Sequence, residues 1–222
     1  PWPPLTPRLV PEYAGPVYDP ATLRIIPSTR LARVHLYRHG EVERGPERMC
    51  RGQADVALSA TGRASAAQVA RRFLNEFGPP DRVLTSDLSR CTEMAVQFGV
   101  RPEPIPGLRE QDMGAWEGRT WAELSEADGA AVTAYWDNYA EARPTHGESW
   151  MEVAARVVHT WNALGALEGR VVVCTHVGPI RALLCAWLGL GADQALRFAP
   201  GYCSETRVLL ADAGAVIERM GA

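Results

Sequence analysis

The chain has 222 residues and a mass of 24.2 kDa, a size that suits one domain or one domain with a small cap. Apolar residues make up 46% of the chain and charged residues 22%, a balance that excludes global disorder and allows a full hydrophobic core. Acidic residues outnumber Lys and Arg by 26 to 23, so the net charge is -3, whereas a protein that mainly binds nucleic acid or a membrane surface normally carries a basic excess. We therefore expect no nucleic-acid partner and no membrane partner.

The proline content changes sharply near residue 30. The first 30 residues hold eight of the 17 prolines, and proline removes backbone donors and blocks helix interiors. We expect residues 1–30 to form a proline-rich arm that lies on a catalytic domain formed by residues 31–222. A mobile tail is the alternative interpretation of the same stretch.

An apolar strand is predicted around residues 34–36, and a polar loop follows it to residue 58. Ser59 is expected to cap a long helix, which Gly78 ends. The apolar residues of this helix recur at spacings of three and four: Ala66, Val69, Ala70, Phe73 and Phe77. A second strand is predicted over 82–85.

Ser86-Asp87 is expected to open the next helix, which carries Arg90 in its first turn. Ile105 lies in a short segment flanked by prolines, which favours an edge strand. Two helical stretches are predicted near 121–126 and 130–140. A longer helix follows, with one face marked by Trp150, Val153, Val157, Trp161 and Leu164.

The run 171–174 is continuously apolar, as a buried parallel strand should be. Gly178-Pro179 then starts a helix whose buried face is predicted to hold Ile180, Leu183, Leu184, Trp187 and Leu188. Residues 206–210 and 215–217 are expected to form a closing hairpin. Because strands and helices alternate, we predict an α/β fold, a three-layer sandwich with a mostly parallel sheet and helices on both faces.

Five cysteines are scattered along the chain without a C-x-x-C pair: Cys50, Cys91, Cys174, Cys185 and Cys203. This pattern predicts reduced thiols in the cytoplasm rather than a disulfide framework, and it excludes zinc ribbons and fingers.

Two histidines occupy equivalent positions, because His39 follows one predicted strand and His176 follows another. The carboxyl ends of the strands are where an open α/β sheet binds ligands. Arg38 adjoins His39, and Arg90 begins the helix after the strand that lies between them in the sequence. Two imidazoles and two guanidinium groups at one edge of the sheet favour an anion pocket, since Arg donors match phosphate oxygens.

A metal site is the alternative interpretation of the first of these histidines. His35 and His39 are four residues apart, a spacing that suits metal binding on a helix. Here they fall on a strand and the loop after it, and no third ligand lies nearby in the sequence. We therefore predict no metal ion and no other cofactor.

Several short motifs occur in a fixed order between about residues 34 and 210. They are Arg38-His39-Gly40-Glu41; the stretch with Gly52, Asp55, Leu58, Ser59 and Gly62; Ser86 to Ala95; Leu108 to Gly118; Gly147-Glu148-Ser149; and Thr175 to Arg181. This ordered set resembles the histidine phosphatase superfamily, which includes the cofactor-dependent phosphoglycerate mutases.

The resemblance implies a role for each matching residue. His39 would be the nucleophile that forms a phosphohistidine. Arg38, Arg90 and His176 would bind the phosphoryl oxygens and stabilise the charge that develops on them. Glu110 would protonate the leaving alkoxide and then activate water. Three other acids in matching blocks would order loops or line the pocket: Glu41, Glu117 and Glu148.

The sequence departs from the family pattern at three positions that we expect to lie at the substrate. Gly45 stands where many members have a phosphate-contacting Asn, Arg51 where Gln, Ser or Thr is common, and Val177 in place of the first glycine of H-G-G. An additional guanidinium at Arg51 is expected to favour substrates with a second anionic group, and a solvated loop arginine is the alternative. Trp116 and Trp121 lie nearer to the active loop and are the better candidates to stack on the substrate, whereas Trp150, Trp161 and Trp187 are expected to pack in the core.

These features predict a metal-independent phosphomonoesterase that acts on small phosphorylated metabolites. One alternative is a mutase, which returns the phosphoryl group to a bound product. Another is a catalytically silent protein that only binds a phosphorylated ligand. The resemblance implies that mutases carry a longer insertion between the acid and the second histidine, and Glu110 and His176 are only 66 positions apart. Hydrolysis is therefore favoured over phosphoryl return.

Overall fold

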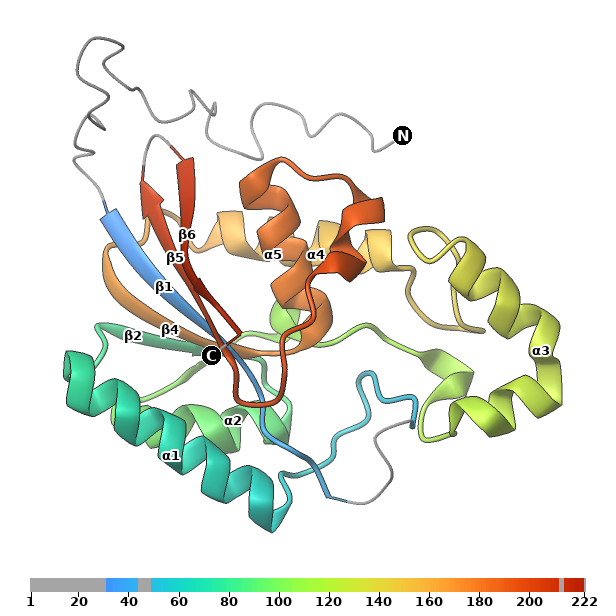
Figure 1. The fold of residues 1–222 in the computed structure, drawn as a ribbon, viewed down its shortest axis with the longest axis horizontal. Helices are drawn as coiled ribbons and strands as arrows, with labels where there is room; N and C mark the ends of the chain where they lie inside the picture. Colours follow the sequence, from blue (N-terminus) through green and yellow to red (C-terminus); the bar gives the residue numbers. More distant parts are fainter. Residues whose placement is uncertain (1–30, 44–48, 212–213, 222) are drawn as a thin grey trace, which may run out of the picture.

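The computed structural model describes residues 31–43, 49–211 and 214–221, so the predicted arm and Gly45 lie outside the described residues (Figure 1). The strands are β1 Leu31–Arg38, β2 Arg82–Thr85, β3 Glu103–Pro104, β4 Gly169–Thr175, β5 Glu205–Ala211 and β6 Gly214–Met220. The α-helices are α1 Ala60–Phe77, α2 Ser89–Ala95, α3 Trp121–Asp137, α4 Trp150–Ala163 and α5 Val177–Leu188. Short 3-10 helices cover Val96–Phe98, Pro106–Leu108, Gly114–Trp116 and Ala192–Arg197.

The strands form one sheet in the order β3-β2-β4-β1-β5-β6. The pairs β3–β2, β2–β4 and β4–β1 are parallel, and β5 runs antiparallel to both β1 and β6. Helical connections place the first four strands in parallel, whereas β5 and β6 are joined directly and form the predicted hairpin. The predicted α/β fold with a mostly parallel sheet is confirmed.

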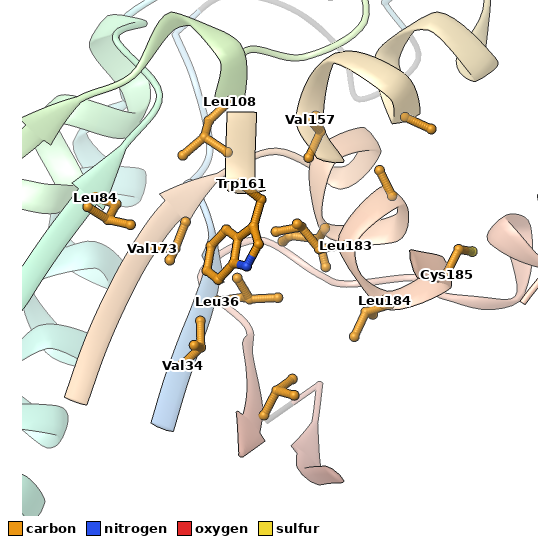
Figure 2. Close-up of a cluster of buried hydrophobic side chains, with 14 of the residues drawn as sticks. Val34, Leu36, Leu84, Leu108, Val157, Trp161, Val173, Leu183, Leu184 and Cys185 are labelled. Carbon is orange, nitrogen blue, oxygen red and sulfur yellow. The ribbon is translucent and has the colours of Figure 1, made fainter. Parts of the chain in front are cut away.

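Helices cover both faces of the sheet, with α1 and α2 on one side and α4 and α5 on the other (Figure 1). Side chains of β1 contribute to the cores on both faces of the sheet. Val34 and Leu36 pack in the core under α4 and α5, and Tyr37 packs in the core under α1. Figure 2 shows Leu36 and Trp161 within the first of these cores. Truncating a buried leucine such as Leu36 to Ala typically costs about 2–5 kcal/mol.

Local signals set the ends of several helices as predicted. The Ser59 hydroxyl accepts a hydrogen bond from the Gly62 N–H, and Gly78 ends α1 with a positive φ of 74°. Within α3, Asp128 leaves helical geometry (φ -157°, ψ 73°), which divides the helix into the two predicted stretches. No helix among the described residues is both long enough and apolar enough to cross a membrane.

Three local predictions were wrong. The helix predicted to open at Ser86-Asp87 begins at Ser89, because Ser86 and Asp87 bond to other parts of the chain instead of capping it. Leu188, at the end of α5, is 37% exposed. Trp116 is buried against Trp121 and Tyr135 in a small core beneath α3, so it is a packing residue.

Candidate active site

Three neighbouring strands end at the same edge of the sheet, and each is followed by a polar side chain. The register aligns Arg38 with Thr175 at the ends of β1 and β4. The His39 N–H donates to the Thr175 carbonyl (3.0 Å) and the Ser86 N–H donates to the Cys174 carbonyl (3.0 Å). This extension of the ladder places the rings of His39 and His176 with their centroids 5.1 Å apart.

His39 is held in one tautomer by its own backbone. Its Nδ1 lies 2.7 Å from the Gly40 carbonyl oxygen, which can only accept a hydrogen bond, so Nδ1 carries the proton. The Nε2 lone pair is therefore available as a nucleophile. Burial and the positive charge of Arg90 hold the pKa of His39 well below its ordinary value, so the imidazole is neutral at neutral pH.

The imidazole of His176 is also neutral, for similar reasons. The Arg90 Nε–H donates to Nδ1 of His176 (3.3 Å), so the proton lies on Nε2, which is 2.9 Å from the Ser86 hydroxyl oxygen. Burial, His39 and Arg90 lower its pKa well below the ordinary value. Ser86 thus lies at the site, whereas the sequence placed it at the start of a helix and in a motif without predicting a role for it.

Arg90 is 2% exposed, and its guanidinium donates hydrogen bonds to the backbone of a loop distant in the sequence. Its Nη1 donates to the Ala54 carbonyl (2.8 Å) and its Nη2 to the Gly52 carbonyl (2.6 Å). These neutral acceptors position the guanidinium and leave its positive charge without a carboxylate in contact among the described residues.

Arg38 is anchored in a similar way. Its Nη1 donates to the Pro200 carbonyl (2.9 Å), and its guanidinium carbon lies 4.1 Å from the ring centroid of Tyr202. Within the described residues, its buried Nε has no hydrogen-bond partner. Burial lowers the pKa of Arg38 from its ordinary value.

The loop that carries Arg51 is fixed by contacts on both sides. The Glu117 carboxylate accepts hydrogen bonds from the N–H groups of Gly52 (3.0 Å) and Gln53 (2.6 Å). A Cβ added at Gly52 would lie 2.1 Å from the Gln111 carbonyl oxygen, so only glycine fits there. The pKa of His39 is lowered by burial first, then by the charges of Arg90 and Arg38, with a smaller contribution from the charge of Arg51.

Glu110 lies half-buried at the start of α5. Its Oε1 accepts hydrogen bonds from the N–H groups of Gln111 and Gly178, both at 3.0 Å. A Cβ at position 178 would lie 2.3 Å from this oxygen. The second glycine of the H-G-G pattern is therefore required by Glu110, whereas the half-buried Val177 replaces the first glycine without such a conflict.

Arg156 organises the chain around Glu110, a role that the sequence analysis missed. It donates to the carbonyl oxygens of Gly107 (2.9 Å), Arg109 (3.0 Å) and Glu110 (3.2 Å) and forms a bidentate pair with Glu148. Burial alone would raise the pKa of Glu148, but Arg156 and the Asp112 N–H outweigh it and lower the pKa. Glu148 thus orders the loop, as expected.

The structure also describes Glu41, another acid in the matching motifs. Its carboxylate accepts a hydrogen bond from the Ser59 hydroxyl (2.8 Å) at the start of α1. Across residues 31–43, 49–211 and 214–221, no three His, Cys, Asp or Glu side chains gather where they could hold a metal ion.

The sequence and the fold were both compared with known proteins. The sequence profile of the histidine phosphatase superfamily (branch 1) matches residues 34–222. The chain belongs to the histidine phosphatase superfamily. In an alignment 179 residues long, it is 35% identical to a glucosyl-3-phosphoglycerate phosphatase of Mycolicibacterium vanbaalenii, and the match covers 74% of this chain and 78% of the relative. In an alignment 184 residues long, it is 34% identical to a probable phosphoglycerate mutase of Proteus mirabilis, and the match covers 80% of this chain and 85% of the relative.

A solved structure of the histidine phosphatase fold supports the same assignment. The native structure of a mycobacterial glucosyl-3-phosphoglycerate phosphatase has a TM-score of 0.75 and 28% identity, and the match covers 87% of this chain and all of that one. The predicted family and the predicted enzyme class, a phosphoric monoester hydrolase, are both confirmed.

Proposed function

We propose that this histidine phosphatase hydrolyses phosphomonoesters of small metabolites in two steps through a phosphohistidine at His39. The observation that carries the proposal is the imidazole of His39, neutral and held with Nε2 unprotonated, beside Arg38 and Arg90, whose Nη groups donate to carbonyl oxygens. A phosphoryl group would supply the acceptor that the buried Nε of Arg38 lacks among the described residues. The names of relatives, which include a metal-independent phosphoserine phosphatase of Arabidopsis thaliana, support small phosphorylated substrates.

In the first step, the Nε2 lone pair of His39 attacks phosphorus while the bond to the leaving oxygen breaks. Glu110, as a carboxylic acid, gives its proton to that oxygen. Arg38, Arg90 and the Nε2–H of His176 stabilise the negative charge on the phosphoryl oxygens. Ser86, which lies 2.9 Å from Nε2 of His176 in the unliganded site, positions that ring.

In the second step, water attacks the phosphohistidine and the N–P bond breaks, which returns the electron pair to His39. The Glu110 carboxylate takes a proton from the water, so the enzyme regains its starting state and inorganic phosphate leaves. The positive charges of the arginines would stabilise the negative charge on the phosphoryl oxygens, as a metal ion does in other phosphatases. Arg51 would add a further positive charge beside His39, and Gly45 and Val177 would line the substrate.

Trapping of labelled phosphate tests this mechanism. Rapid quenching under non-acidic conditions with a labelled substrate should leave the label on His39, and His39→Ala should retain none. EDTA should leave the rate unchanged. Label retained in His39→Ala, or loss of activity in EDTA with rescue by a divalent ion, would contradict the proposal.

We further propose hydrolysis rather than phosphoglycerate mutation. The chain between Glu110 and His176 is largely occupied by α3, α4 and β4, which leaves little length for an additional cover over the phosphoenzyme. With 3-phosphoglycerate, the expected outcome is release of inorganic phosphate and negligible 2-phosphoglycerate. Efficient isomerisation that depends on 2,3-bisphosphoglycerate would contradict hydrolysis while leaving the residue roles intact.

The cysteines support a cytoplasmic location, because all five are buried free thiols.

A further inference from the structure

The segment that leads into β5 lies against the end of β1 (Figure 1). The Cys203 N–H donates to the carbonyl oxygens of Arg38 (3.0 Å) and His39 (3.3 Å). In return, the Arg38 N–H donates to the Ser204 carbonyl (3.4 Å). The side chain of Arg38 reaches the same segment, because its Nη1 donates to the Pro200 carbonyl (2.9 Å). This segment therefore holds the backbone of two neighbouring site residues and the guanidinium of one of them.

A tight turn within the segment carries Tyr202. The Ser204 N–H donates to the Gly201 carbonyl (3.2 Å), which places Tyr202 and Cys203 at the centre of a four-residue turn. Cys203 has a φ of 54°, in the left-handed region that glycine normally occupies. Side chains persist in such a conformation only where surrounding contacts fix them, and these positions are concentrated at functional sites. The strained turn at the end of β1 therefore favours a functional role for Tyr202.

The ring of Tyr202 contacts both residues at the end of β1. The guanidinium carbon of Arg38 lies over this ring, 4.1 Å from its centroid, and the centroid of the His39 ring is 5.6 Å away. A guanidinium over an aromatic face is attracted to the ring and keeps the N–H donors at its edge for other partners. The Arg38 Nε is such a donor, because it is buried and has no hydrogen-bond partner among the described residues.

An aromatic ring suits an arginine that must bind a phosphoryl group. Two arginines of the acid loop and α4 are held by carboxylates instead, since Arg109 pairs with Asp87 and Arg156 pairs with Glu148. A carboxylate on Arg38 would compete with a phosphoryl dianion for its donors. A ring restrains the guanidinium and leaves its positive charge available.

We propose that Tyr202 is a positioning residue of the phosphoryl site, whose ring holds the guanidinium of Arg38 so that its Nε–H can bind a phosphoryl oxygen beside His39. The inference rests on the proposed phosphatase mechanism and adds to it a residue outside the ordered motifs of the family. Because Tyr202 acts on the group that is transferred, its removal affects phosphomonoesters alike, whatever their leaving group. Removal of the Glu110 acid, in contrast, affects poor leaving groups most.

Packing of the loop alone is the competing explanation, and the chain offers a matched control for it. Phe77 makes the same kind of contact, because the guanidinium carbon of Arg207 lies 4.6 Å from its ring centroid. Phe77 is also half-buried, but it lies at the end of α1 and packs against His35 rather than His39. Phe77→Leu therefore removes a half-buried ring and its cation–π contact away from the phosphoryl site.

The test measures kcat/KM for glycerol 3-phosphate and p-nitrophenyl phosphate, and the Kd of inorganic phosphate by calorimetry. Tyr202→Leu should lower kcat/KM by the same factor on both substrates, roughly 10-fold, and should weaken phosphate binding to a similar extent. Tyr202→Phe should recover most of this loss, because it keeps the ring. Phe77→Leu should lower the midpoint of urea unfolding but keep the wild-type kcat/KM and phosphate Kd.

A double-mutant cycle shows whether Tyr202 acts through Arg38. In an Arg38→Gln background, Tyr202→Leu should cause little further loss, because the guanidinium that the ring positions is gone. Equal losses in the two backgrounds would overturn the proposal. If circular dichroism shows that Tyr202→Leu does not fold, Tyr202→Met replaces it in every comparison.

Other results would also overturn the proposed role. A loss in Tyr202→Phe as large as in Tyr202→Leu would assign the effect to the hydroxyl, and a loss confined to one substrate would place Tyr202 at the leaving group. Unchanged phosphate binding in Tyr202→Leu, or equal weakening in Phe77→Leu, would mean that the ring only packs. Absence of turnover by the wild type would contradict the proposed function, and phosphate binding would still decide the role of Tyr202.

Discussion

His35 and His39 lie four residues apart on β1 and at its end, and both are buried, yet their surroundings differ in charge. The Nδ1 of His35 is 2.5 Å from a carboxylate oxygen of Glu205, which Arg207 also contacts. Phe73 and Phe77 pack against the His35 ring. His39 instead bonds to a backbone carbonyl and lies among arginines that have carbonyl acceptors.

This comparison shows how to tell a structural buried histidine from a reactive one. Near His35, the negative charge of Glu205 is paired with the positive charge of Arg207, and the Glu205 carboxylate is also hydrogen-bonded to His35. These hydrogen bonds outweigh the effect of burial, so the pKa of Glu205 is lowered. Around His39, neither Arg38 nor Arg90 has a carboxylate within ion-pair distance among the described residues, which favours the binding of an anion. Burial lowers the pKa of both imidazoles, so a shifted pKa alone would not separate them.

The largest expected effect separates the two histidines by function. His39→Ala should lower kcat by roughly a thousand-fold or more, because no other nucleophile replaces its Nε2. His35→Ala should change kcat only a few-fold but lower the free energy of unfolding by about 1–3 kcal/mol, because it leaves Glu205 with one fewer partner. Steady-state kinetics and urea unfolding of both variants check this. A large loss of kcat in a folded His35→Ala protein would break the distinction.

The next effect depends on the leaving group. Glu110→Gln should slow hydrolysis of alkyl phosphates by roughly 100-fold or more, because the alkoxide needs a proton. Activated aryl phosphates should be slowed far less. Parallel measurements of kcat/KM with glycerol 3-phosphate and p-nitrophenyl phosphate check the difference. Equal losses on both substrates would mean that Glu110 has a structural role or that another group is the acid.

A methyl group at position 178 should disturb the acid without disturbing the fold. Gly178→Ala places a Cβ 2.3 Å from Glu110 Oε1, so we expect kcat for alkyl phosphates to fall on the order of 10-fold. Gly129→Ala is the matched control, because nothing lies within 4 Å of the added Cβ. Kinetics and circular dichroism of both variants provide the measurement. Full activity in Gly178→Ala would show that Glu110 tolerates displacement.

The smallest effect concerns stability at acidic pH. Because the folded pKa values of His39 and His176 lie well below about 6.5, the unfolded chain binds more protons than the folded protein below that pH. Stability should therefore be unaffected by these groups above pH 6.5 and should fall as the pH drops below it, by up to about 1.4 kcal/mol per pH unit for each group. His39→Gln should lose less stability than the wild type between pH 7.5 and 5.5. Identical urea-unfolding profiles would contradict the neutral state of His39.

Much of the architecture followed from local sequence patterns. The apolar run at 171–174 predicted β4, and Ser59 and Gly78 predicted the ends of α1, because strands, caps and turns depend on neighbouring residues. The ordered motifs predicted the family and proposed His39, Arg90 and Glu110. Trp116 was misjudged because closeness to a loop in the sequence says nothing about which side chains cover it.

The order of residues along the chain was enough to show which chemical groups are present and at which strand ends they lie. The partner of each group, in contrast, depends on folding: Ser86 contacts His176 from 90 positions away, and Arg38 contacts Pro200 from 162 positions away. Likewise, nothing in the spacing showed that Arg90 lacks a carboxylate partner within the described residues while Arg156 pairs with Glu148. Local patterns arise from backbone geometry over a few residues, whereas the balance of charge in a site depends on segments that meet only when the chain folds.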